Sequence, residues 1–88
     1  MQQMEVVVRN RHGLHARAAA RVAIAAATFK SSIELVVNGR RANARSLLAV
    51  MLLAAAMGAR VSIETRGPDE VEAIRSVAQL VESERPGP

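Results

Sequence analysis

Cysteine, tyrosine and tryptophan are absent from this 88-residue sequence, and its single phenylalanine is Phe29. Without thiols the chain can form no disulfide and no thiolate-ligated zinc or iron–sulfur centre. The core must therefore be built from Ala, Val, Leu, Ile and Met, in a sequence that is 50% hydrophobic. We expect one domain over residues 1–88, since a chain this short builds a single core.

Long hydrophobic runs are also lacking. The longest spans residues 47–58, which is 12 residues, whereas a helix needs about 20 to cross a bilayer. This run predicts a buried or partner-facing helix and no membrane insertion. Residues 1–5 lack the basic and apolar regions of a signal peptide, so we expect a cytoplasmic protein.

Acidic residues are scarce in the first three-quarters of the chain. Residues 1–66 hold ten bases and three acids, a net charge of +7, whereas residues 67–88 carry a net −3. A basic body attracts nucleic acid, but equally phosphorylated or acidic proteins. Because stacking Tyr and Trp are lacking and no Lys/Arg run is longer than a pair, we expect no specific nucleic-acid partner.

Short β-branched segments, most of them alternating, predict strands, which helical segments separate. The Asn38-Gly39 pair is a strong hairpin signal because both residues tolerate positive φ. We expect Ser46 to be the N-cap of the second helix and Gly58 to be its C′ residue, the first one past the helix end. We predict strands at residues 4–8, 32–37, 41–44 and 60–66, and helices at 16–28, 47–57 and 69–84. Residues 85–88 are expected to form a flexible tail.

The element order β-α-β-β-α-β-α predicts an α+β fold. Strands that alternate apolar and polar residues are typical of an antiparallel sheet with one solvated face. We therefore predict an open-faced β-sandwich, with a four-stranded antiparallel sheet and three helices on one face. The helices should turn inward the apolar stripes at positions 19, 22, 23, 26 and 27 and at positions 71, 74, 77, 78 and 81.

The loop before the first helix holds the residues best suited to chemistry. Gly13 permits a sharp turn, and His15 lies at the helix start, where free N–H groups form a phosphate site. Arg17 can add a charge-assisted hydrogen bond to the same anion. Both the arginine and the positive helix end disfavour protonated imidazole, leaving a ring nitrogen of His15 able to attack.

Two plainer interpretations of His15 remain at this point. It could merely cap the helix or shape the turn, as most histidines near a helix start do. It could also bind a metal together with His12, although the loop offers no further acid or cysteine as ligand. We predict no metal and no cofactor.

The segment Gly13-Leu14-His15-Ala16-Arg17 resembles the active-site signature of HPr, the histidine-containing phosphocarrier family of the bacterial phosphoenolpyruvate-dependent sugar phosphotransferase system. The resemblance extends over almost the whole chain. It includes the chain length, the Asn38-Gly39 hairpin, the Ala44-Arg45-Ser46-Leu47 segment and the Gly67 turn before an acidic helix start.

This resemblance implies a carrier that is not a free-standing enzyme. Enzyme I would place phosphate on Nδ1 of His15, and the carrier would pass it to sugar-specific enzyme IIA domains. The Arg17 side chain and the backbone amides of Ala16, Arg17 and Ala18 would hold the phosphate. The family has proline where this chain has Ala18, so the helix entry should be less constrained.

Two further features have both a structural and a functional interpretation. Ser46 is a preferred N-cap residue, and it also matches the family's regulatory serine, the target of HPr kinase/phosphorylase. The helix after it is apolar on nearly every side, which fits either a thick core or a docking patch. The resemblance favours docking of enzyme I and IIA domains at Leu47, Leu48 and Met51.

Other functions stay open. A regulatory binding module that has lost transfer is one alternative, although His15 is retained. A carrier of a nitrogen-related phosphotransferase branch is another, which Ala18 and the arginine-rich surface leave open. We expect a monomer.

Overall fold

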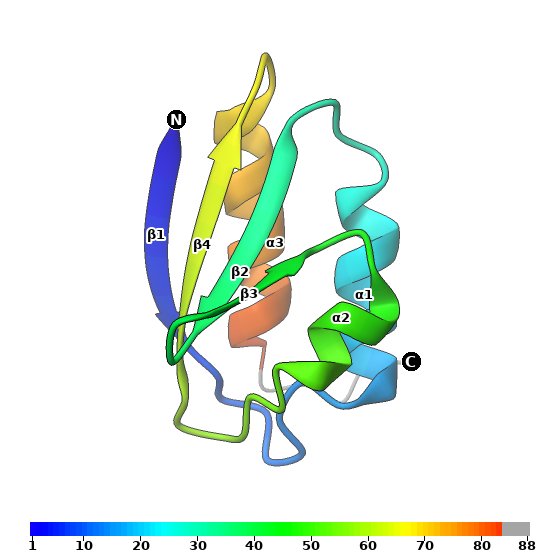
Figure 1. The fold of residues 1–88 in the computed structure, drawn as a ribbon, viewed down its shortest axis with the longest axis vertical. Helices are drawn as coiled ribbons and strands as arrows, with labels where there is room; N and C mark the ends of the chain where they lie inside the picture. The colour runs from blue at the N-terminus through cyan, green and yellow to red at the C-terminus, as the bar shows by residue number, and fades with distance from the viewer. Residues whose placement is uncertain (84–88) are drawn as a thin grey trace.

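The computed structural model describes residues 1–83 (Figure 1). The tail predicted at residues 85–88 lies outside this range, whereas the third helix ends at Glu82, two residues before the end predicted at Glu84. The elements follow the predicted order β-α-β-β-α-β-α, which confirms the α+β open-faced arrangement.

Four strands form one antiparallel sheet in the order β1-β4-β2-β3. Strands β2 and β4 have the predicted bounds, whereas β1 begins two residues earlier than predicted and β3 one residue earlier. The tight turn at Asn38 and Gly39, with φ of 51° and 80°, explains how β3 returns beside β2. The strands are β1 Gln2–Val7, β2 Ser32–Val37, β3 Arg40–Asn43 and β4 Arg60–Arg66.

The alternation along β2 and β4 separates an apolar face from a polar one. Ile33, Leu35 and Ile63 are buried under the helices. On the opposite face Arg41 donates to Glu34 and Glu64 at 3.0 Å each. The hydrogen bond and charge of Glu64, with the charge of Glu34, raise the pKa of the Arg41 guanidinium. One face of the sheet is thus left to solvent.

Three helices cover the apolar face: α1 Ala16–Ala26, α2 Leu47–Leu52 and α3 Glu70–Glu82. Helix α3 runs behind β4 and β2 in Figure 1, and α1 lies beside it, with α2 packed against α1. Within residues 1–83 no helix is long and apolar enough to cross a membrane.

The second helix is half as long as predicted. It ends at Leu52, because Ala54 takes a left-handed conformation with φ of 53°. The chain then turns under the first loop, where the Leu14 N–H donates to the Ala55 carbonyl at 2.9 Å and the Gly58 N–H to the Val8 carbonyl at 2.8 Å. These tertiary bonds override the helix preference of the alanine-rich run.

The predicted core stripes need smaller corrections. Helix α1 ends at Ala26, two residues early, so Ala27 is exposed and Ala23 only half-buried. On α3, Val71 is 40% exposed, and Ala73 is buried in its place. The stripe on α3 is therefore rotated by part of a turn relative to the prediction.

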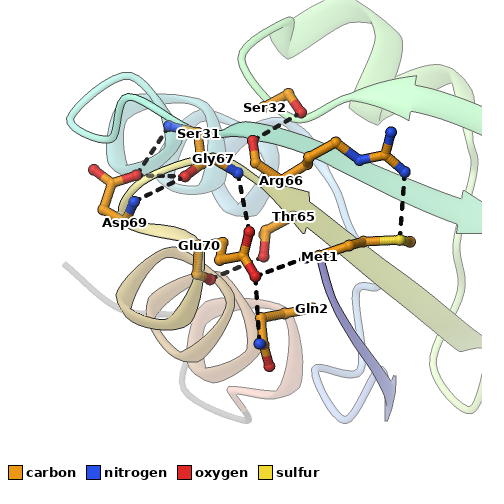
Figure 2. A network of polar contacts seen from close by, with 9 residues as sticks. All are labelled: Met1, Gln2, Ser31, Ser32, Thr65, Arg66, Gly67, Asp69 and Glu70. Carbon is orange, nitrogen blue, oxygen red and sulfur yellow. Dashed lines mark hydrogen bonds and ion pairs between the residues drawn. The ribbon is translucent and has the colours of Figure 1, made fainter.

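Asp69 ties the turn before β2 to the start of α3 (Figure 2). Its carboxylate accepts hydrogen bonds from the N–H groups of Lys30 and Ser31 at 2.9 Å each, and from the Ser31 hydroxyl at 2.5 Å. These hydrogen bonds lower the pKa of Asp69 to about 2, and the bond from the Ser31 hydroxyl has the largest effect. Glu70, beside it, accepts from the Gly67 N–H at 3.1 Å.

Candidate functional site

The loop between β1 and α1 is clamped against the segment that follows α2. Gly13 has φ of +67°, and a Cβ there would lie 2.4 Å from the Ala55 carbonyl oxygen. This close approach lets the Leu14 N–H donate to Ala55 at 2.9 Å. Figure 1 shows the two segments side by side at the bottom of the molecule. Together they fix the position at which α1 begins.

Asn10 shapes the same loop from the other side. It is buried, and its side-chain oxygen accepts from the His12 N–H at 2.9 Å while its carbonyl accepts from the Gly13 N–H at 2.9 Å. An asparagine that bonds the backbone two residues on stabilises a turn. The loop therefore has one defined shape.

His15 is the N-cap of α1, as predicted. Its backbone is extended, with φ of −72° and ψ of 179°, and its carbonyl accepts the first helical bond from Ala19 at 2.8 Å. Its Nδ1 accepts from the Arg17 N–H at 3.3 Å. An accepting nitrogen carries no proton, so a neutral ring in this arrangement holds its proton on Nε2.

The second ring nitrogen of His15, Nε2, is enclosed by protein. Nε2 is buried and finds no hydrogen-bond partner among residues 1–83. The rings of His12 and His15 meet edge to face, with centroids 5.7 Å apart and planes at 87°. The two histidines share a shallow hollow whose lining is His12, Leu14, His15, Met51, Ala54, Ala55 and Ala56.

The three residues predicted to hold phosphate form the first turn of α1. The N–H groups of Ala16, Arg17 and Ala18 precede the first helical bond, so the helix itself offers them no carbonyl. Ala16 and Arg17 are exposed, whereas Ala18 is half-buried against the core. The Arg17 side chain therefore lies at the surface.

The residues that the structure describes contain no group of three or more His, Cys, Asp or Glu that could hold a metal ion. His12 and His15 are close, but they stand as a pair. The arrangement fits anion binding at a helix start better than metal coordination.

Ser46 is the N-cap of α2, and its hydroxyl accepts from the Ala49 N–H at 3.1 Å. Its neighbour Arg45 reaches back to the end of α1, where its guanidinium donates to the carbonyls of Ala26 and Phe29. The start of α2 is thus fixed against the end of α1. The structural interpretation of Ser46 as a cap is confirmed.

Helix α2 turns part of its surface outward. Leu48 and Leu52 are 65% and 66% exposed, and Leu47 and Met51 about 40%, whereas Val50 is buried. We call Leu47, Leu48, Met51 and Leu52 the apolar patch. Met51 also lines the hollow beside His15, so the patch adjoins the histidine. Leu52 was missing from the prediction, which took the patch residues from the family resemblance.

Known proteins resemble this chain over most of its length. A family model described as the PTS HPr component phosphorylation site matches residues 2–83. The phosphocarrier protein HPr of Cupriavidus necator is 42% identical over 81 residues, which span 92% of this chain and 91% of that protein.

Two solved structures show the same fold. The phosphocarrier protein HPr from Bacillus anthracis has a TM-score of 0.88 and 34% identity, over 92% of this chain and 96% of that one. Crh, a Bacillus subtilis catabolite repression protein crystallised as a dimer with a swapped domain, has a TM-score of 0.73 and 38% identity, over 92% and 93% of the two chains.

Proposed function

The chain belongs to the HPr family of phosphocarriers of the phosphotransferase system, and on that premise we propose that His15 is the residue that carries its phosphoryl group. The observation that supports this assignment is the placement of Nδ1. That atom accepts the Arg17 N–H in the first turn of α1, at 3.3 Å from the Arg17 nitrogen. A helix start is a natural site for a phosphate dianion.

Transfer would begin with attack by the Nδ1 lone pair on the phosphorus of a phosphorylated donor. The N–P bond forms at Nδ1 as the bond from phosphorus to the donor breaks, and the His15 ring keeps its Nε2 proton. The new bond displaces the Arg17 N–H from Nδ1, and a phosphoryl oxygen can accept that N–H instead. The amides of Ala16 and Ala18 and the Arg17 guanidinium would complete the cradle.

We propose phosphorylated enzyme I as the donor and sugar-specific enzyme IIA domains as acceptors. The apolar patch supports docking, because its four large apolar side chains lie exposed and one of them, Met51, lines the hollow beside His15. Methionine within such a patch adapts to different partners. The bases Arg11 and Arg17 would favour an acidic rim on the partner. Such a carrier would work in the cytoplasm.

We further propose that HPr kinase/phosphorylase can modify Ser46. A phosphate there would add about two negative charges at pH 7 next to Leu47 and Leu48. Docking through the apolar patch would then weaken, since desolvating a charge is unfavourable. Incubation with the kinase and ATP, followed by intact mass, tests this proposal; a Ser46→Ala control that gains as much mass would contradict it.

Two alternatives are weaker. A regulatory module without transfer could use His15 as a helix cap alone, and the likeness to Crh, a catabolite repression protein, is the observation in its favour. A nitrogen-related branch would change the acceptor and leave the chemistry of His15 as it is. We propose a monomer, in which β1 pairs with β4 of the same chain over six residue positions.

The relay itself provides the test. The protein is incubated with enzyme I and phosphoenolpyruvate, and then an enzyme IIA domain is added. We expect one acid-labile phosphate per chain, which the IIA domain then removes. Failure of several enzyme I proteins to label the folded chain would refute the carrier function.

A further inference from the structure

The two ring nitrogens of His15 have unlike surroundings. Nδ1 accepts the Arg17 N–H, so it is held in place by the helix start. Nε2 is buried, with no hydrogen-bond partner among residues 1–83. A buried polar atom without a hydrogen-bond partner normally lowers stability. A neighbouring group must therefore hold the His15 ring in this orientation, since otherwise the ring would turn Nε2 toward water.

His12 is the aromatic neighbour of that ring. The two rings meet edge to face with centroids 5.7 Å apart, a favoured geometry for aromatic pairs. The His12 backbone is itself fixed, because its N–H donates to the buried Asn10 side chain at 2.9 Å. His12 is thus an exposed residue on a fixed turn, and its ring contacts the ring of His15. The Arg17 N–H holds the His15 ring at Nδ1.

We propose that His12 is a positioning residue that covers Nε2 of His15 and so directs phosphorylation to Nδ1. The inference rests on the function proposed for His15. The His12 ring and the walls of the shared hollow, such as Leu14 and Ala55, leave a phosphoryl donor no approach to Nε2. By holding the ring in this orientation they also keep Nδ1 on the Arg17 N–H, so a neutral ring has its proton on Nε2 and the Nδ1 lone pair faces the helix start.

The test uses a small donor, so that no protein partner decides the outcome. Phosphoramidate transfers its phosphoryl group to imidazole: the ring nitrogen bonds to phosphorus, the P–N bond of the reagent breaks, and ammonia leaves. Either nitrogen of a free imidazole can react. Nuclear magnetic resonance of 15N-histidine-labelled protein identifies which nitrogen of His15 bears the phosphorus, and, before the reaction, which nitrogen bears the proton.

Three proteins are compared: wild type, His12→Ala and His12→Phe. In wild type we expect the Nε2–H tautomer and phosphate on Nδ1. Loss of one aromatic contact should raise the ratio of Nε2 to Nδ1 product in His12→Ala by about three- to tenfold, with a matching shift in the tautomer signals. The phenyl ring of His12→Phe should restore the wild-type ratio, because an aromatic ring is enough to cover Nε2 and the imidazole nitrogens of His12 are not required.

An unchanged ratio and unchanged tautomer in folded His12→Ala would overturn the inference, as would wild-type protein phosphorylated mainly on Nε2. Urea unfolding of each variant verifies the fold. The outcome is separable from the carrier function: a wild type that takes phosphate on Nδ1 from phosphoramidate but none from enzyme I would refute the carrier function and leave the role of His12 standing.

Discussion

Gly13 is the point at which the site loop is most sensitive to a single added methyl group. Its φ of +67° lies in the left-handed region, and a Cβ would stand 2.4 Å from the Ala55 oxygen and 3.0 Å from the Ala56 Cα. Both obstacles are backbone atoms, so no side chain can move aside. Gly13→Ala must therefore separate the loop from the segment after α2, by roughly 1 Å before contact becomes ordinary.

The cost has two parts. A left-handed conformation costs a non-glycine residue about 1–2 kcal/mol. Separation of the two segments also weakens the Leu14–Ala55 hydrogen bond, worth about 0.5–1.5 kcal/mol, with some loss of packing. We expect Gly13→Ala to lower the free energy of unfolding by about 2–4 kcal/mol, which corresponds to a fall in Tm of at least about 8 °C for a domain of this size.

Gly39→Ala is the matched control. Gly39 has a similar φ of +80°, but a Cβ there would meet nothing within 4 Å. It should show only the conformational cost of about 1–2 kcal/mol. Urea unfolding of both variants measures the difference. Equal unfolding midpoints would refute the claim that the loop and the segment after α2 are pressed together at Gly13.

Three further predictions follow from single contacts. The pKa of Asp69 is lowered in the folded protein, so its carboxylate stabilises the fold above its ordinary pKa near 3.8 and loses this effect as the pH falls through about 2. The free energy of unfolding should therefore drop between about pH 4 and pH 2. In urea titrations at several pH values, Asp69→Asn should flatten that drop. Ser46→Ala removes the hydrogen bond to Ala49 and should cost about 1 kcal/mol of stability, whereas Ser46→Asp, which can still cap, should cost less. Leu48 is 65% exposed, so Leu48→Ala should change the free energy of unfolding by less than about 0.5 kcal/mol. The variant should nevertheless be labelled more slowly by enzyme I, while its labelling by phosphoramidate stays as fast as in wild type. Equal effects on both donors would count against docking at the apolar patch.

Local patterns predicted the sheet well. Strands β2 and β4 alternate buried residues with more exposed ones, and their predicted bounds are those observed. The hairpin could be located because Asn38 and Gly39 are the residue types that accept positive φ. Such features depend on neighbours in sequence, so the sequence alone carries them.

The end of α2 depends on distant contacts and was predicted wrongly. Residues 47–57 are good helix formers, and Ala54 is an unusual choice for a left-handed residue. The turn there is set by Leu14 and Val8, which bond the segment from across the molecule. Helix preference cannot reveal a partner some forty residues away.

The candidate site was predicted in part. His15 was expected at a helix start and stands as the N-cap of α1. The contact from His12 was missed, since His12 was considered as a possible metal ligand together with His15. The Asn10 side chain that anchors its backbone offered a signal, since asparagine two residues before a turn position often forms such a bond. The role of Asp69 in holding Ser31, 38 residues away, left no local trace.

Whether Nδ1 of His15 carries the phosphate can be read from phosphorus–nitrogen correlation spectra of 15N-histidine-labelled protein that enzyme I and phosphoenolpyruvate have phosphorylated. We expect one phosphorus per chain, bonded to Nδ1 of His15, together with a changed amide signal for Arg17 as its N–H leaves Nδ1. A signal at Nε2, at His12 or at any residue that survives His15→Ala would contradict it.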